Sequence, residues 1–316
     1  MMQYRTLGRT GLRVSLAGLG TGGASQIGQA TGRTVAESHR LVRTALDLGI
    51  NIFDTSPNYR NSEELLGGAL EGIPRDRYIL ATKFPPKPRG SDALYEDPEA
   101  LMHVLEQSLK HLRVDTIDIL QYHMVYPNEY RAVIDRFHPI ALRAQEQGKV
   151  RFLGITETVA GDPTHEMLPM ALAEDLFDVL MVKYGILNQR AKEKVLPMAR
   201  ERNVGVFVMA SVRTSLRNPA EAVAHISRFI DEGLLDIPKP SLDDPLGLGR
   251  VGEAVPSLTR AAYQFAAAPE AVSTVLIGTG NEEHLRANVA DILGPRLSEA
   301  QLAYLRKTYG RLAWSA

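Results

Sequence analysis

The 316-residue chain contains no cysteine. Disulfides, iron–sulfur clusters, thiolate-bound zinc and cysteine nucleophiles are therefore excluded, whereas a reducing compartment is allowed. The chain also lacks an excess of either charge, because 36 Lys and Arg residues oppose 37 Asp and Glu residues and the formal net charge is -1. A protein that binds nucleic acid or a membrane surface usually carries a basic excess, so we expect neither partner.

Long apolar runs are missing too. No stretch approaches the roughly 18 apolar residues that span a bilayer, and the N-terminal segment lacks the apolar core of a signal peptide. Hydrophobic residues make up 44% of the chain and charged residues 23%, the balance of an ordinary globular protein. We therefore expect a cytoplasmic protein whose residues 1–316 form a single domain.

Short apolar runs alternate with longer amphipathic stretches along the chain. Each run is almost continuously hydrophobic, which is typical of parallel strands buried on both faces. Strands that alternate with helices in this number favour a closed (β/α)8 TIM barrel, an α/β fold, over an open doubly wound sheet, which stays the alternative. The predicted strands are residues 16–19, 51–53, 78–81, 117–120, 151–155, 177–182, 204–209 and 274–277.

Turn and cap signals complete the predicted architecture. Residues 3–14 predict an N-terminal β-hairpin with its turn at 8–11, and we expect it to plug the N-terminal end of the barrel. The sequence Asp97-Pro98-Glu99 predicts a helix start. A long interval, 212–255, breaks the alternation and contains a helical stretch near 219–231. Because long loops are often functional, we expect it to close over a bound cofactor, and a static surface loop is the alternative for the Pro/Gly-rich run around 237–252.

The glycine-rich segment 18–23 matches the G-x-G-x-x-G pattern of Rossmann dinucleotide-binding domains. That pattern must open a helix at once, with an acidic residue about twenty positions later. Here residues 24–33 are polar, contain glycine and do not resemble a helix start. The segment therefore predicts a tight loop at the mouth of the first strand.

Four polar residues follow or end consecutive predicted strands: Asp54, Lys83 and His123, with Tyr59 in the loop after Asp54. In a barrel all four would lie at the C-terminal rim, where active sites occur. Singly, each has an ordinary structural explanation, such as a loop cap or a satisfied buried histidine. Together, an acid, an amine, an imidazole and a phenol on adjacent strand ends predict an active site.

Carbonyl reduction gives these residues a common purpose. The reaction needs a hydride at carbon and a proton at oxygen, and a tyrosine with a pKa of about 10 is a weak acid unless a cation lowers that pKa. Lys83 would supply the cation, Asp54 would hold Lys83 in place, and His123 would orient or polarise the carbonyl oxygen. No metal is expected.

At these residues the chain resembles the aldo-keto reductase family. The resemblance implies a (β/α)8 barrel, a nicotinamide cofactor across the C-terminal ends of the strands, and the catalytic residues Asp54, Tyr59, Lys83 and His123. Family members usually prefer NADPH and are cytoplasmic. The matching segments are 49–55 with Tyr59, 62–67, 69–70, 81–83, 108–112, 115–123, 148–154 and 277–288.

The resemblance also assigns a set of cofactor-binding positions, several with atypical residues. Gly22 stands where the family often has Trp, which predicts a wider substrate pocket. Gly278 and His284 replace cations that usually meet the NADPH phosphate, so we expect NADP as cofactor with NAD possible, NADH binding about tenfold or less weaker. The positions are Gly20, Thr21, Thr156, Glu157, Met181, Ser211, Gly278, Thr279, Gly280, His284, Arg286 and Asn288.

The leading hypothesis is an NAD(P)H-dependent oxidoreductase that reduces an aldehyde or ketone to an alcohol, or the reverse, with Tyr59 as general acid and base. Glu157, Met181 and Ser211 depart from the family pattern and keep open a second hypothesis, a cofactor-binding regulatory subunit of low turnover. A phosphate-handling barrel isomerase is weaker, because its chemistry does not need this set of side chains. The partner is a small carbonyl or alcohol compound that the sequence does not identify.

Overall fold

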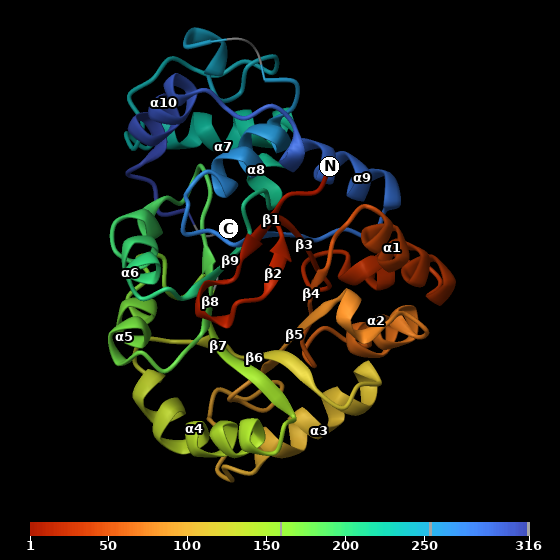
Figure 1. Cartoon of the computed structure of the whole chain (residues 1–316). Helices are drawn as coiled ribbons and strands as arrows, with labels where there is room; N and C mark the ends of the chain where they lie inside the picture. Colours follow the sequence, from red (N-terminus) through yellow and green to blue (C-terminus); the bar gives the residue numbers. More distant parts are fainter. Residues whose placement is uncertain (159, 253–254, 315–316) are drawn as a thin grey trace.

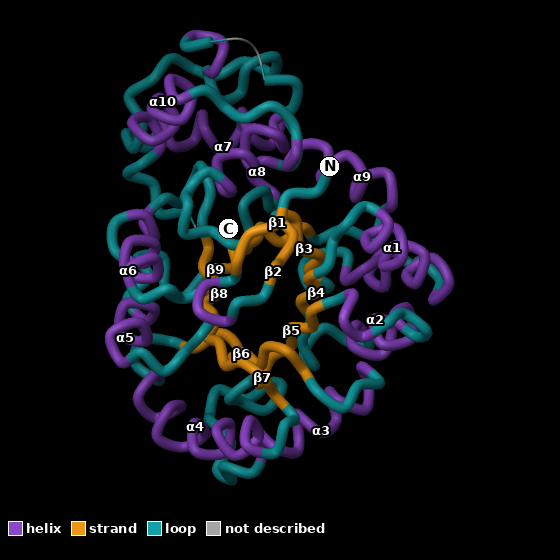
Figure 2. Tube along the Cα trace, in the orientation of Figure 1, coloured by secondary structure: helices purple, strands orange, loops and turns teal. Residues whose placement is uncertain are grey.

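The computed structural model describes residues 1–158, 160–252 and 255–314. Eight parallel strands close into a barrel in the order β10-β3-β4-β5-β6-β7-β8-β9, which confirms the predicted fold. Figures 1 and 2 look down this ring, with helices arranged around its outside. The strands are β3 (Ala17–Gly20), β4 (Ile52–Asp54), β5 (Ile79–Phe84), β6 (Ile117–Val125), β7 (Val150–Glu157), β8 (Val179–Lys183), β9 (Gly205–Met209) and β10 (Thr274–Ile277).

The outer layer consists of helices that follow the strands along the chain. The predicted helix near 219–231 is confirmed as α7, whose N-cap Asn218 accepts a hydrogen bond from the Glu221 amide. The predicted start at Asp97 is early, because α3 begins at Ala100 and Asp97 caps only the turn before it. The helices are α1 (Val35–Asp47), α2 (Ser62–Leu70), α3 (Ala100–Leu112), α4 (Tyr130–Glu146), α5 (Met167–Glu174), α6 (Val195–Glu201), α7 (Pro219–Asp231), α8 (Leu258–Ala267), α9 (Glu282–Leu293) and α10 (Glu299–Tyr309).

An antiparallel hairpin, β1 (Tyr4–Thr6) and β2 (Arg13–Ser15), lies across the opening of the ring in Figure 1. Its Leu7 is fully buried and packs with the apolar side chains inside the barrel. Gly8 has φ +47°, and a Cβ there would lie 2.3 Å from the Gly205 amide nitrogen. Only glycine fits so close to the backbone at this angle, so the turn can rest on the first residue of β9.

The segment after β3 contains no α-helix. The chain leaves Gly20, makes a loop, and enters a 3-10 segment (Gln26–Thr31) in which Gln26 and Ile27 have positive φ angles. The prediction of a loop at 18–23 is therefore correct only from Thr21 onward, because Gly18 to Gly20 belong to β3, and no helix opens there as a Rossmann turn would require. Within the described ranges, no helix is long and apolar enough to cross a membrane.

Candidate active site

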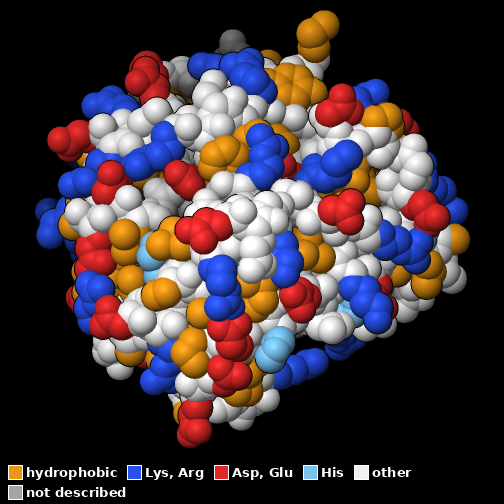
Figure 3. Space-filling model, turned by 60° about the horizontal axis from the view of Figure 1, so that its bottom comes forward, with side chains coloured by type: hydrophobic (Ala, Val, Ile, Leu, Met, Phe, Trp, Pro, Cys, Tyr) orange, Lys and Arg blue, Asp and Glu red, His pale blue; other side chains and the backbone are white. Residues whose placement is uncertain are grey.

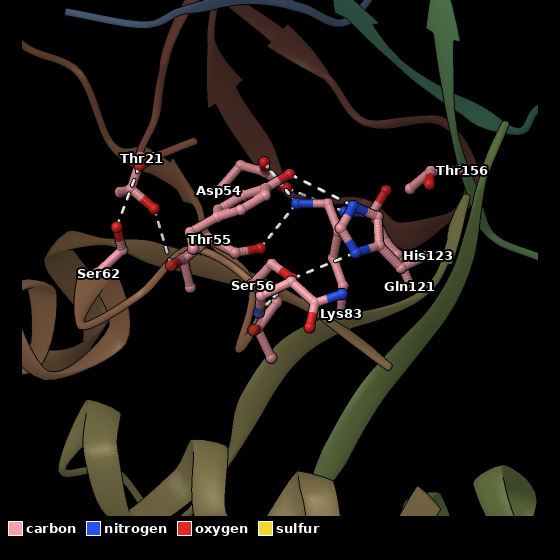
Figure 4. A network of polar contacts seen from close by, with 12 residues as sticks. Thr21, Asp54, Thr55, Ser56, Ser62, Lys83, Gln121, His123 and Thr156 are labelled. Atoms are coloured by element: carbon pink, nitrogen blue, oxygen red, sulfur yellow. Dashed lines mark hydrogen bonds and ion pairs between the residues drawn. The ribbon is translucent and has the colours of Figure 1, made fainter. Parts of the chain in front are cut away.

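The barrel brings the four predicted catalytic residues together at the C-terminal ends of its strands. Asp54 ends β4, Lys83 lies in β5, His123 lies in β6, and Tyr59 belongs to the loop before α2. Asp54, Lys83 and His123 are 3%, 0% and 7% exposed. Figure 4 shows these three side chains pointing toward one another.

The Lys83 ammonium is fixed by hydrogen bonds to two oxygen atoms. Its ammonium donates to Asp54 Oδ2 and to the Thr55 carbonyl, both at 2.7 Å. The Gln121 amide donates to the other Asp54 oxygen at 3.1 Å. Burial alone would lower the pKa of Lys83, but the nearby Asp54 and Tyr59 raise it above its ordinary value. The lysine is therefore a fixed cation, and it lies 5.0 Å from the centre of the Tyr59 ring.

His123 contacts the tyrosine hydroxyl. Its Nε2 lies 3.4 Å from the Tyr59 oxygen and its Nδ1 lies 3.2 Å from the Ser56 hydroxyl. Burial, reinforced by the Lys83 cation, lowers the pKa of His123 well below its ordinary value. The imidazole is thus neutral at physiological pH and places a polar nitrogen beside the Tyr59 hydroxyl without adding charge.

The electrostatics of Tyr59 differ from the sequence-based expectation in one respect. Lys83 lowers the pKa of Tyr59 as predicted, but burial raises it by more, and the net shift is upward. The sequence indicates the cation but not how deeply the phenol is buried. Tyr59 is therefore a protonated acid in this structure, with a cation placed to stabilise its conjugate base.

Gly22 provides the surface on which the Tyr59 ring lies. A Cβ at Gly22 would stand 2.7 Å from Cε2 and Cζ of that ring, a distance that real Cβ contacts do not show. The space that the missing side chain leaves is therefore filled by Tyr59. The structure therefore relates Gly22 to the placement of the phenol, whereas the wider substrate pocket that the sequence predicts there stays a prediction.

Sequence reasoning missed three residues of this site, namely Gln121, Thr55 and Ser56. Gln121 precedes His123 by two positions, and residues i and i+2 of a strand share a face, so this spacing was a usable signal. Thr55 and Ser56 act through a carbonyl and a hydroxyl in a loop, and no pattern marks such contacts.

The predicted cofactor-binding residues spread around the rim. Thr156 lies near His123 in Figure 4, and its hydroxyl accepts a hydrogen bond from the Met124 amide at 2.8 Å. Met181 packs with the apolar side chains inside the barrel. Ser211 is 4% exposed, and its hydroxyl has no hydrogen-bond partner among the described residues.

Glu157 has partners within the protein that the sequence does not indicate. Its carboxylate is buried, accepts a hydrogen bond from the Lys183 amide at 2.7 Å, and pairs with His165 Nδ1 at 2.7 Å. The other nitrogen of His165 lies 3.3 Å from Asn188 Oδ1. Glu157 thus links the end of β8 to the loop that contains His165, and its predicted contact with the cofactor stays a prediction.

The opposite side of the rim is formed by β3, β10 and the start of α9. A Cβ on Gly278 would lie 3.9 Å from the Gly20 carbonyl oxygen, so the two backbones run close together. Thr279 accepts a hydrogen bond from the Asn281 amide, and Asn281 in turn caps α9. The remaining residues predicted here are Thr21, which is buried, Gly280, which lies against Gly28, His284 and Arg286, which are exposed, and Asn288, which is half-buried.

Two observations fit a dinucleotide across this rim. The buried Ser211 hydroxyl lacks a partner within the described ranges, and a buried polar group without a hydrogen bond is costly unless a ligand supplies one. The exposed backbone of Gly278 leaves room that a larger side chain would fill. Ser211 follows β9 and Gly278 follows the neighbouring β10, so one ligand could reach both positions.

The model of the aldo/keto reductase family matches residues 18–309. The chain belongs to the aldo-keto reductase family. This aldo-keto reductase is 29% identical over 302 residues to an L-galactose dehydrogenase of Arabidopsis thaliana, covering 92% of this chain and 88% of the relative. It is 28% identical over 346 residues to an NADH-specific methylglyoxal reductase of Escherichia coli, covering 97% and 98%.

Among solved structures, the chain is similar to the holo form of an aldo-keto reductase from Bacillus halodurans. The TM-score is 0.71 at 25% identity, with 97% of this chain and 96% of that chain covered. The family match and the enzyme names of these relatives make the chain an NAD(P)H-dependent oxidoreductase that acts on carbonyl groups. The hypothesis of a regulatory subunit finds no support in them.

Proposed function

We propose that this aldo-keto reductase reduces a small aldehyde or ketone to its alcohol, or catalyses the reverse reaction, with Tyr59 as the proton donor and acceptor. The observation that carries the proposal is the Tyr59 hydroxyl 3.4 Å from a neutral His123, with the Lys83–Asp54 ion pair at 2.7 Å beneath the ring. Geometry and charge are those that proton transfer to a carbonyl oxygen needs.

A bound reduced nicotinamide would supply the hydride to the carbonyl carbon. Tyr59 then gives its proton to the carbonyl oxygen and becomes a phenolate, which the buried Lys83 ammonium stabilises. Asp54 and the Thr55 carbonyl keep that ammonium in place. His123 fixes the position of the oxygen that receives the proton. Gly20, Thr156, Ser211 and Gly278 would hold the dinucleotide.

The proposed cofactor is NADPH with only a modest preference over NADH. The first turn of α9 carries two acids, Glu282 and Glu283, and Asn281 already accepts hydrogen bonds from the Glu283 and His284 amides. These features weaken the anion site that a bare helix N-terminus would offer. The Escherichia coli relative that is named as NADH-specific supports the same view.

We further propose that residues 1–316 act as one domain in the cytoplasm, without a nucleic-acid or membrane partner. The near balance of 36 basic and 37 acidic residues supports this. On the face shown in Figure 3, basic and acidic side chains are interspersed, and neither sign forms a continuous patch. Such a surface lacks the basic stripe that phosphate backbones require.

The test of the proposed function is Tyr59→Phe. The variant should lose carbonyl reduction by about two to four orders of magnitude and still bind NADP+, because only the transferable proton is removed. Steady-state NADPH consumption with a panel of aldehydes and calorimetric titration with NADP+ measure the two properties. Tyr78→Phe, which removes a phenol just before β5 at the other end of the barrel, is the matched control. Activity in Tyr59→Phe close to that of Tyr78→Phe would exclude Tyr59 as the acid.

A further inference from the structure

The C-terminal tail of the chain lies against the rim near the ends of β8 and β9. The Trp314 amide donates to the Leu187 carbonyl at 3.1 Å, just after β8. On its other side the indole packs against α7, where the Arg228 guanidinium lies 4.4 Å from the ring centre. Indole Nε1 also donates to the Ser215 hydroxyl at 2.7 Å. The tail is thus held from two directions.

The Trp314 carbonyl accepts hydrogen bonds from two buried side chains. The Lys183 ammonium is one donor, and Asn188 Nδ2, at 3.4 Å, is the other. The two residues are 5% and 3% exposed. Burial, together with Arg213 nearby and against the opposing effect of Glu157, lowers the pKa of Lys183 to about 8. A neutral carbonyl offsets only part of the hydration that a buried ammonium loses, so a charged partner would bind Lys183 better.

The side chains around Lys183 include several hydrogen-bond donors and few acceptors that are free to bind it. Ser211 lines the same hollow, and its buried hydroxyl has no partner within the described ranges. Ala210 and Arg213, on either side of Ser211, have φ +61° and +36°, strained angles that cluster at ligand-binding sites. Glu157, the acid that faces Lys183, is committed to His165 and to a backbone amide. An anion is the ligand that matches such a lining.

We infer that Lys183, Asn188 and Ser211 form a seat for a phosphate group, and that the Trp314 carbonyl occupies this seat until a phosphate displaces the tail. The free space beside the tail is about 20 Å³, enough for one water molecule. A phosphate can therefore enter only when the tail moves away. The phosphate group could belong to the dinucleotide, and in that case the inference rests on the proposed function. It could also belong to free inorganic pyrophosphate, which has the same chemistry.

The first experiment follows the tail directly, because Trp314 is the single tryptophan of the chain. The protein is titrated with NADP+ and, separately, with inorganic pyrophosphate while tryptophan emission is recorded. Displacement should shift the emission to longer wavelength as the indole leaves Arg228 and Phe229. A shift with NADP+ assigns the seat to the cofactor, and a shift with pyrophosphate alone assigns it to a free phosphate. No shift with either would overturn the inference.

The second experiment compares Lys183→Met with Lys194→Met, which removes the same charge from an exposed position before α6. Lys183→Met should raise the Kd for NADP+ about tenfold or more and abolish the emission shift, whereas Lys194→Met should stay within about twofold. Lys183→Arg, which keeps the charge, should retain most of the affinity and guards against a folding defect. If pyrophosphate alone shifts the emission, the same comparison is made with its Kd. Equal Kd values in the two methionine variants, for the ligand that shifts the emission, would contradict the seat.

The third experiment loosens the tail. Trp314→Leu removes the indole contacts with α7 and leaves the backbone in place, so the carbonyl should compete less well and NADP+ should bind several-fold more tightly. Weaker or unchanged binding of the ligand that shifts the emission, NADP+ or pyrophosphate, would show that the tail does not compete.

A wild-type protein that reduces carbonyls without any emission shift would refute this inference alone. One whose Trp314 responds to pyrophosphate but which binds no nicotinamide would refute the proposed function alone.

Discussion

At the scale of single residues, the lack of a Cβ at Gly22 should affect turnover through the position of Tyr59. Because a Cβ there would lie 2.7 Å from the Tyr59 ring, Gly22→Ala should push the phenol away from His123 and Lys83. We expect turnover to fall about a hundredfold, the effect of a misplacement near 1 Å, with the Kd for NADP+ nearly unchanged. The measurement is kcat and KM with NADPH, together with calorimetry.

The control for this prediction is the next residue. Gly23 has φ +73°, and no atom lies within 4 Å of the position that a Cβ would take there, so Gly23→Ala adds backbone strain without a collision. That variant should be somewhat less stable, by about 1 kcal/mol, but should keep most of its turnover. If Gly22→Ala and Gly23→Ala lose turnover equally, loop strain and not the contact with Tyr59 explains the loss.

His123 provides a prediction on pH. Burial and Lys83 hold its pKa well below the ordinary value, so the folded protein keeps this imidazole neutral at pH values where a free histidine is already protonated. The rate of carbonyl reduction should therefore show no acid limb near pH 6.5, the pKa of an unperturbed histidine. Nitrogen NMR of the ring between pH 8 and 5.5 measures its charge directly. A titration of His123 in that range would contradict the assigned environment.

At the scale of elements, the start of α9 decides how well the cofactor phosphate is bound. With two acids in the first turn and Asn281 capping two amides, an additional phosphate gains little. We expect kcat/KM with NADPH to exceed that with NADH by about tenfold or less, equivalent to ~1.4 kcal/mol. A preference of several hundredfold would mean that a cation, such as the exposed Arg286, reaches the phosphate.

The long segment 212–255 includes α7 and, beyond it, a loop with little regular structure. We predict that this segment closes over bound cofactor, and limited proteolysis with and without NADP+ tests it. Cleavage within 232–250 should slow when NADP+ is present, because closure shields the backbone. Residues 253–254 lie outside the described part of the chain. Unchanged cleavage rates would indicate a static surface loop.

The strands were predictable because both of their faces are buried, so hydrophobic runs mark them without alternation. The largest differences are at β5 and β6, which continue beyond their predicted ends at residues 81 and 120, β5 through Lys83 to Phe84 and β6 through His123 to Val125. Polar side chains interrupt the apolar run there, and the register with β7 shifts between Tyr122 and Val125. The polar residues of the candidate site thus hide the ends of these strands from a search for hydrophobic runs.

At the scale of the whole molecule, the sequence predicts which residues meet at the candidate active site, but it does not predict most contacts along the rim that we propose for the cofactor. Asp54, Lys83 and His123 each lie at or near a strand end, and barrel topology alone brings such ends together. The partners of Glu157 come from two loops, at His165 and Asn188. Contacts of this kind depend on tertiary packing between distant segments, and no local pattern in the sequence encodes them.

The pairing of β3 with β10, Ala17 beside Val275, has a consequence for how the protein is made. On the ribosome β3 emerges before the other seven strands of the barrel, but its partner on one side, β10, is translated after them. Throughout synthesis the nascent chain therefore carries an open strand edge that another chain can pair with. A ribosome that stalls before residue 274 would release a curved open sheet with two unpaired edges, and folding chaperones would have to shield those edges from other chains.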